Sequence, residues 1–331
     1  MPIHDRFHRA ITYLRVSVTD RCNLRCVYCM PEEGVQLRTH EEILRYEEIA
    51  RIVRVGSELG LTKVRLTGGE PLVRPGIERL VAMIAQIPGL NDLAMTTNGI
   101  LLARYARALA AAGLGRVNVS LDSLHPKRFH EITRWGTLDD VLSGLRAAEE
   151  AGLTPIKINT VVVRGLNDEE VPTLVAWAAR RGYRLRFIEW MPVGHTVEDI
   201  AAWRSRFVSA REIRERIEAA YGPLEAGGAR TTGPARCYRV QGMEVEIGFI
   251  SPISERFCSQ CNRLRLTADG QLRPCLLSDR ELDLRTPLRQ GIDDEGLKAL
   301  LIEAVRMKPF GHHLDRDWRD AEERTMAEIG G

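Results

Sequence analysis

The chain has 331 residues, of which 44% are hydrophobic, and this is ordinary for a globular protein of about two domains. Its formal net charge of +2 gives no bulk electrostatic reason to expect nucleic acid or a membrane surface as a partner. The charged start has no apolar core of the kind that signal peptides carry. No uncharged apolar run approaches the roughly 18 residues of a membrane span, so neither kind of segment is expected.

The first two thirds of the chain alternate short β-like runs with helical patterns. The runs cover Tyr13–Val18, Lys63–Thr67, Asp92–Thr97, Arg116–Ser120, Ile156–Val161 and Arg184–Glu189. The helical patterns cover Glu42–Leu59, Pro75–Gln86, Leu101–Ala112, Leu138–Ala151 and Glu169–Arg180. This alternation favours right-handed βαβ crossovers and a parallel sheet. We therefore expect an α/β fold, built as an open doubly wound sheet or as an incomplete (β/α)6 TIM-like barrel.

Each β-like run has a polar face and an apolar face. Arg15 alternates with Leu14 in the first run, and Arg65, Lys157 and Arg186 take polar positions in later runs. Burying so many unpaired charges would be prohibitive, so this face must line a wet or ligand-filled cavity. A curved, barrel-like sheet around an anionic ligand fits the pattern. The alternative is an antiparallel sheet with one solvated face, which the long helical segments between the runs disfavour.

Three cysteines follow the first β-like run. Cys22, Cys26 and Cys29 have the spacing C-x3-C-x2-C, so a single loop could bring three thiolates to one metal centre. Cubane iron–sulfur clusters usually take four cysteine ligands, so three would leave one iron open. The alternatives are a zinc site, which usually has four protein ligands, and chance clustering. Six of the seven cysteines lie in two tight groups, which suits metal ligation better than disulfides and indicates a reducing, cytoplasmic setting.

Polar segments also follow the later runs. They lie at the carboxyl ends of the strands, where parallel α/β folds usually place their active sites. Thr67–Pro71 contains two glycines, which let a backbone approach a ligand closely, and Glu70 adds an acceptor. Taken alone, this Gly-Gly-Glu-Pro segment is a weak signal that a plain turn would also explain. Thr97–Gly99, Ser120–Ser123 and Glu189–Pro192 follow other runs.

The last third predicts a second, strand-rich region. Ser209 with Glu212 resembles a capping box that opens a helix. Strand-like pieces follow around Tyr238–Ile250, and a hairpin is expected over Leu264–Leu272. A further amphipathic helix is expected over Asp294–Met307.

A second cysteine group lies within these strands. Cys258 and Cys261 form a C-x-x-C pair, and Cys275 comes from the returning arm of the expected hairpin. We interpret the group as a second iron–sulfur cluster with an open iron, with structural zinc as the alternative. Cys237 is the remaining candidate for a fourth ligand, although isolated free cysteines are commonly small core residues.

The loop Cys22–Cys29, with the aromatic Tyr28 before its last cysteine, resembles the radical S-adenosylmethionine (SAM) superfamily. Nearly the whole chain resembles one family within it, the GTP 3′,8-cyclases of molybdenum cofactor biosynthesis. The segments that carry this resemblance are Arg15–Cys29, Arg65–Pro71, Thr96–Gly99, Asn118–Ser123, Lys157–Thr160, Arg186–Pro192, Cys258–Leu266, Cys275 and the Gly330-Gly331 end.

The resemblance implies an enzyme that cyclises GTP to (8S)-3′,8-cyclo-7,8-dihydroguanosine 5′-triphosphate, the first step of molybdenum cofactor (molybdopterin) biosynthesis. It implies SAM and two [4Fe-4S] clusters as cofactors. It also implies a radical SAM partial barrel in residues 1–208, and a C-terminal domain in residues 209–331 that carries the second cluster and a Gly-Gly tail.

The same resemblance assigns roles to individual residues. The SAM-binding cluster would be held by Cys22, Cys26 and Cys29, and the second cluster, facing the guanine, by Cys258, Cys261 and Cys275. SAM would contact Tyr28, Gly69, Ser120 and Met191. GTP would contact Arg15, Arg65, Thr96, Lys157, Arg186, Arg263, Leu264 and Arg265, with Arg15 as the candidate general acid. The cations on the polar strand face agree with this, since a triphosphate carries about four negative charges.

The expected partners are GTP, SAM, an electron donor and a downstream pterin-forming enzyme, and the chain is expected to be a monomer or a homodimer. The alternative function is a radical SAM peptide-modifying enzyme with an auxiliary cluster, against which the cation-lined strand face speaks. A non-catalytic zinc or iron–sulfur scaffold would differ in its zinc-to-iron ratio. A GTP-binding switch is disfavoured, because no G-x-x-x-x-G-K-[ST] phosphate loop occurs.

Overall fold

The computed structural model describes residues 2–193, 200–227, 233–312 and 324–330. Its centre is a run of parallel strands in chain order: β3 (Tyr13–Ser17), β4 (Lys63–Thr67), β5 (Asp92–Thr97), β6 (Arg116–Ser120), β7 (Lys157–Val162) and β8 (Arg184–Glu189). The connecting helices are α1 (Tyr46–Glu58), α2 (Ile77–Ala85), α3 (Leu102–Ala111), α4 (Pro126–Thr133), α5 (Leu138–Glu150) and α6 (Val171–Arg181). The six expected β/α units are therefore confirmed, and α4 is the only one of these helices that the sequence pattern missed.

Strands from the C-terminal part extend this sheet at both ends. Strand β12 (Arg263–Leu266) pairs in parallel with β3, and β11 (Glu246–Ile250) pairs in parallel with β8. Antiparallel strands complete the order at either side: β13 (Gln271–Arg273), β14 (Leu282–Asp283), β10 (Arg236–Val240) and β9 (Leu224–Ala226). The described strands thus form an open sheet that ends in β14 and β9. The α/β prediction is confirmed, the antiparallel alternative is wrong for the central strands, and the pairing does not establish a barrel.

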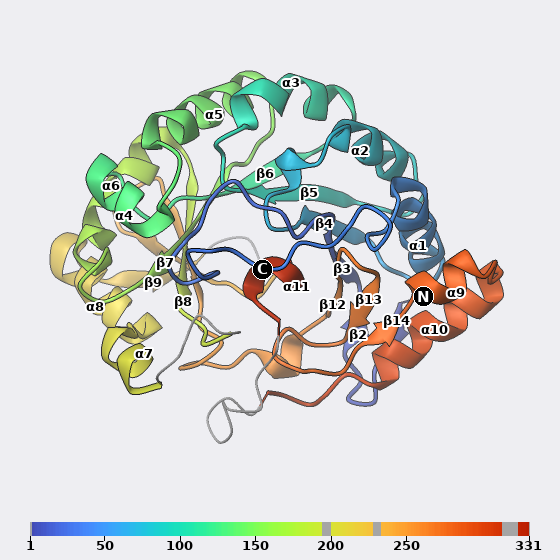
Figure 1. The fold of residues 1–331 in the computed structure, drawn as a ribbon. Coiled ribbons are helices and arrows are strands. Elements are labelled where there is room, and N and C mark those ends of the chain that lie inside the picture. Colours follow the sequence, from blue (N-terminus) through green and yellow to red (C-terminus); the bar gives the residue numbers. More distant parts are fainter. Residues whose placement is uncertain (1, 194–199, 228–232, 313–323, 331) are drawn as a thin grey trace.

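The sheet is curved, and the helices cover its outer side. Figure 1 shows α1, α2, α3, α5 and α6 along an outer arc, with the short C-terminal helix α11 (Met326–Ile329) on the inner side. The remaining elements are the ribbon of β1 (Ile3–His4) and β2 (Ala10–Ile11), and the helices α7 (Ile200–Arg206), α8 (Ala210–Tyr221), α9 (Arg285–Arg289) and α10 (Asp294–Arg306). The capping box at Ser209 and the hairpin of β12 and β13 are both present as predicted.

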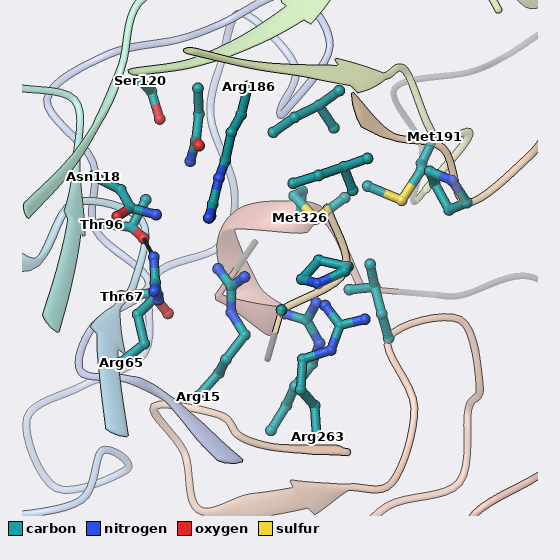
Figure 2. Close-up of a pocket in the computed structure, with 18 of the residues that line it drawn as sticks. Arg15, Arg65, Thr67, Thr96, Asn118, Ser120, Arg186, Met191, Arg263 and Met326 are labelled. Carbon is teal, nitrogen blue, oxygen red and sulfur yellow. Dashed lines mark hydrogen bonds between the residues drawn. The ribbon is translucent and has the colours of Figure 1, made fainter. Parts of the chain in front are cut away.

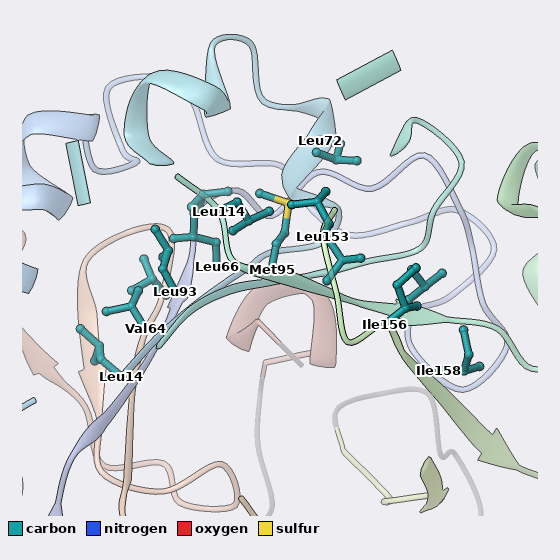
Figure 3. Packing of buried hydrophobic residues seen from close by; sticks show 14 of the residues in the cluster. Leu14, Val64, Leu66, Leu72, Leu93, Met95, Leu114, Leu153, Ile156 and Ile158 are labelled. Carbon is teal, nitrogen blue, oxygen red and sulfur yellow. The ribbon is translucent and has the colours of Figure 1, made fainter. Parts of the chain in front are cut away.

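The hydrophobic core lies between the sheet and the outer helices. Leu14 and Leu66 from the strands are fully buried, as are Ile49 and Leu80 from the helices, and all belong to one cluster. Figure 3 shows strand residues of this cluster packed together on one side of the sheet. Since side chains alternate across a strand, the polar residues between them face the opposite, inner side. None of the described helices combines the length and the apolar character that crossing a bilayer requires.

Candidate functional site

The inner faces of the central strands line one cavity of about 570 Å³. Among its lining residues are both cysteine groups and a row of cations: Cys22, Cys26, Cys29, Cys258, Cys261, Cys275, Arg15, Arg65, Lys157, Arg186, Arg263 and Arg265. The prediction that the polar strand face lines a cavity is therefore confirmed.

The two cysteine groups lie at opposite ends of the parallel strands. Cys22 follows the carboxyl end of β3, whereas Cys261 precedes the amino end of β12. Arg263, the first residue of β12, is paired with Tyr13, the first residue of β3, so the two amino ends are level. A strand of five residues spans roughly 16 Å. The cations on the strand faces consequently lie between the two groups.

The first cysteine loop is anchored on α4. The backbone N–H of Arg25 donates to Thr133 O at 2.9 Å, and that of Cys29 donates to Cys26 O at 2.9 Å. Burial raises the pKa of Cys22 to about 11 and that of Cys29 to about 12, so both thiols would be neutral in the metal-free protein. Three partly buried cysteines from one loop are a donor set that suits an iron–sulfur cluster.

The Gly-Gly-Glu-Pro turn packs against the same loop. A Cβ atom on Gly69 would lie 2.4 Å from the carbonyl oxygen of Arg21, so only glycine fits. The carboxylate of Glu70 accepts hydrogen bonds from Thr97 Oγ1 at 2.7 Å and from the Asn98 N–H at 2.7 Å. Burial raises the pKa of Glu70 to about 7. Glu70 thus ties two strand-end turns together within the protein, whereas the sequence had indicated an acceptor for a ligand.

All four residues expected to contact SAM line the cavity, namely Tyr28, Gly69, Ser120 and Met191. Figure 2 shows Ser120 and Met191 on different sides of the cavity, with Arg186 between them in the view. The Tyr28 hydroxyl donates to Asp122 Oδ2 at 2.6 Å, a partner that the sequence did not indicate.

The expected GTP-binding cations point into the cavity, where Figure 2 shows Arg15, Arg65, Arg186 and Arg263 around a common space. Arg65 Nη1 donates to Thr96 Oγ1 at 3.5 Å. The Nε atoms of Arg65 and Arg186 are buried without a hydrogen-bond partner in the described residues. Burial, followed by the nearby Arg186 and other cations, lowers the pKa of Lys157 to about 7. A polyanion in this space would provide the missing acceptors and offset the repulsion among the cations.

The second cysteine group is assembled by the β12–β13 hairpin. Arg265 is paired with Arg273, which brings Cys275 back towards the start of β12. Burial acts to raise the pKa of Cys261, but Arg263 and Lys308 nearby hold it at about 6. None of the seven cysteines forms a disulfide in the structure, and Cys237 does not line the cavity.

Within the described ranges, no three His, Cys, Asp or Glu side chains converge on a site for a single metal ion. A cubane cluster contacts each cysteine through a different iron, so its ligands surround a larger volume than those of one ion. The cysteine arrangement is compatible with that larger group.

Leu264, which is expected to contact GTP, directs its side chain away from the cavity. Its side chain is 2% exposed and belongs to the hydrophobic core, on the face of β12 opposite Arg263 and Arg265. Any contact from Leu264 to GTP would therefore come from its backbone. The sequence also failed to indicate the cavity-lining Arg9 and Lys308, because neither belongs to a strand pattern or a motif.

The C-terminal segment enters the cavity. Met326 and Ala327 of α11 are among its lining residues, and Met326 is visible there in Figure 2. The carbonyl oxygen of Gly330 accepts hydrogen bonds from Arg265 Nη1 at 3.1 Å and from Thr67 Oγ1 at 3.3 Å. Gly331, the other residue of the expected Gly-Gly tail, lies outside the described residues.

Two family models and many relatives match this chain over most of its length. A family model described as the radical SAM superfamily matches residues 16–178, and one described as Molybdenum Cofactor Synthesis C matches residues 183–314. The chain is 50% identical to proteins named GTP 3′,8-cyclase from Pelotomaculum thermopropionicum and Thermodesulfovibrio yellowstonii. Each alignment covers 99% of this chain, and 100% and 99% of the two relatives, respectively.

A solved structure supports the fold independently. Streptococcus suis SuiB bound to S-adenosylmethionine superposes with a TM-score of 0.59 at 14% identity, covering 89% of this chain and 69% of that one. At this identity the similarity concerns the fold alone.

Proposed function

Because this chain belongs to the GTP 3′,8-cyclase family of the radical SAM superfamily, we propose that it cyclises GTP to (8S)-3′,8-cyclo-7,8-dihydroguanosine 5′-triphosphate. This is the first step of molybdenum cofactor biosynthesis. The observation that carries the proposal is the single cavity in which two cysteine groups face each other across a row of cations.

The cysteine groups fit two [4Fe-4S] clusters, one held by Cys22, Cys26 and Cys29 and the other by Cys258, Cys261 and Cys275. When bound and reduced, the first cluster with SAM supplies a 5′-deoxyadenosyl radical, which can take a hydrogen atom from the ribose C3′ of GTP. The role of the protein is to orient the nucleotide so that C3′ lies close to C8 of the guanine, and to exclude water.

Two sets of cations in the cavity would bind different parts of GTP. Arg65, Lys157 and Arg186 lie on the central strands β4, β7 and β8, where they would bind the triphosphate. Arg263 and Arg265 lie on β12, next to the second cysteine group, where they would orient the purine. The nucleotide would thus span the cavity between the two groups. The curved, open sheet would act as an incomplete barrel around it.

Arg15 is the proposed general acid that completes the cyclisation. It lines the cavity on β3, beside Arg263 and Arg65. Burial lowers the pKa of its guanidinium to about 10, which makes proton donation easier than from an exposed arginine.

Other assignments remain part of this proposal. Tyr28, Gly69, Ser120 and Met191 would contact SAM, and residues 1–208 and 209–331 would form the two functional parts. These parts share one sheet, since β11 and β12 lie beyond residue 208 and pair with β8 and β3. Cysteines that form no disulfide are consistent with a cytoplasmic location, and an electron donor and a pterin-forming enzyme would be the partners of this protein.

The test is anaerobic. The protein is reconstituted with iron and sulfide, reduced and given SAM, and the products are compared by mass spectrometry with and without GTP. We expect 5′-deoxyadenosine together with a cyclised guanine nucleotide. Deoxyadenosine with unchanged GTP would contradict the assignment of GTP as the substrate. It would favour the peptide-modifying alternative instead. Loaded clusters without SAM cleavage would contradict the radical SAM activity itself.

A further inference from the structure

Lys308 is a buried lysine that joins two arms of the second cysteine group. Only 2% of its surface is exposed, and it follows the C-terminal end of α10. Its Nζ donates to the carbonyl oxygens of Arg263 at 2.8 Å and Pro274 at 2.6 Å. Arg263 is two residues from Cys261, and Pro274 directly precedes Cys275. One ammonium group therefore fixes the spacing between two cysteine-bearing segments of the hairpin.

The charge of Lys308 is unusual in this position. A buried ammonium is costly unless hydrogen bonds and negative charge compensate it. The two carbonyls use two of its three N–H groups. The opposite charges that act on it are the thiolates of Cys261 and Cys275, which exist as such when they ligate a metal. The ammonium thus lies at the cysteine group, with one donor left over.

The third cysteine is tied to the same segment of chain. Arg9 forms an ion pair with Asp5 at 2.5 Å, and donates to Cys258 O at 2.7 Å and to Pro309 O at 2.6 Å. Pro309 is the neighbour of Lys308, so residues 308 and 309 are linked to all three cysteine-bearing segments. Such outer contacts set the geometry and the electronic properties of iron–sulfur sites.

We propose that Lys308 is a positioning residue of the second iron–sulfur cluster, which holds the Cys261 and Cys275 segments together and places a positive charge beside the cluster. This rests on the proposed function only in that the second cysteine group binds a cluster. A nearby positive charge stabilises the reduced cluster, which is the more negative state, and so raises its reduction potential. The reaction itself need not proceed for this to be measured.

The experiment uses the full chain with Cys22, Cys26 and Cys29 replaced by serine, so that only the second group can bind a cluster. Lys308→Met, Lys308→Arg and the control Lys298→Met are made in this background. Lys298 of α10 is partly exposed and pairs with Glu295 and with Glu58 of α1. Iron and sulfide content and the midpoint potential are measured after anaerobic reconstitution, by a redox titration followed by electron paramagnetic resonance.

We expect Lys308→Met either to lose the cluster while retaining a native circular dichroism spectrum, or to retain it with a lower midpoint. The expected decrease is tenfold in the reduced-to-oxidised ratio at a given potential, or about 59 mV for a one-electron couple. Lys308→Arg should restore most of the cluster content and midpoint potential of the parent. Lys298→Met should match the parent in both.

An unchanged cluster content and midpoint potential in Lys308→Met would overturn the proposal for Lys308 and leave the proposed function untouched. If Lys308→Met does not fold, Lys308→Gln is judged by the same criteria. If the parent itself binds no cluster, the proposal fails together with the two-cluster model. SAM cleavage by the unaltered enzyme would still test the remainder of the proposed function separately.

Discussion

The carbonyl oxygen of Gly330 lies 3.1 Å from Nη1 of Arg265, a side chain that lines the cavity with both cysteine groups. These residues are 65 positions apart in the chain, and the contact brings the C-terminal segment against a side chain expected to bind GTP. Arg265 is buried beside Arg15 and Arg263, so the carbonyl supplies an acceptor among like charges. Gly330 is consequently held beside the cavity, and Met326 and Ala327 of the same C-terminal segment form part of the cavity wall.

Replacing Gly330 with alanine should impair turnover more than folding. Gly330 has a φ of +78°, and a Cβ there would lie 2.6 Å from Thr67 Oγ1. We expect kcat to fall at least about tenfold, a cost of roughly 1.4 kcal/mol in the barrier, with little change in the thermal unfolding temperature. Gly291→Ala is the matched control, because Gly291 has a φ of +85° and no atom near its Cβ position. Equal activity of the two variants would contradict a functional role for the tail.

Lys157→Met should weaken GTP binding and leave SAM cleavage possible. The loss of one charge-assisted hydrogen bond corresponds to about 1.5–3 kcal/mol, or roughly tenfold to a hundredfold in Kd. Isothermal titration calorimetry measures this, with Lys298→Met as the control for the removal of a lysine. Wild-type affinity in Lys157→Met would contradict the assignment of the inner strand face to GTP.

GTP binding should also take up a proton at Lys157. Its pKa of about 7 in the free protein makes it mostly neutral at pH 8, and the triphosphate favours its charged form. Calorimetry at pH 8 in buffers of different ionisation enthalpy should therefore show about one proton taken up per GTP, declining towards pH 6.

The stability of the GTP-free protein should also depend on Lys157. This lysine binds its proton more tightly in the unfolded chain than in the folded one, so the free energy of unfolding should rise with pH between about 7 and 10.5. Neither effect should persist in Lys157→Met.

Gly69→Ala should reduce SAM affinity while the iron content stays unchanged. The added methyl group would lie 2.4 Å from the backbone of Arg21, so the turn must move away from the cysteine loop. We expect Kd for SAM to rise at least about tenfold. Gly227→Ala, whose Cβ would meet only ordinary contacts, controls for the substitution itself. Unaltered SAM binding would show that the turn does not position this cofactor.

The two cysteine groups should be separable by substitution. Cys26→Ser and Cys258→Ser should each lose about half of the iron, or about four atoms per chain for a cubane cluster. Only Cys26→Ser should abolish 5′-deoxyadenosine formation, whereas Cys258→Ser should still cleave SAM without cyclising GTP. Cys237→Ser should behave as wild type. Zinc in either group after metal analysis of anaerobically purified protein would favour the structural alternative.

Much of this site follows from the sequence alone. Period-two alternation in the strands fixed which face would be polar, because neighbouring side chains in a strand point to opposite sides. That is why Arg15, Arg65, Lys157 and Arg186 were correctly placed on one surface. The spacing of Cys22, Cys26 and Cys29 predicts a ligand set from one loop, because all three belong to one short segment.

The tertiary structure decided what depends on contacts between distant segments. The pairing of β12 with β3 placed the second cysteine group at the opposite end of the strands from the first, and local spacing contains no such information. The roles of Lys308 and Arg9 depend on hydrogen bonds to backbone carbonyl groups far away in the chain. Because every residue has a backbone carbonyl, the sequence could not indicate which of them would accept these bonds.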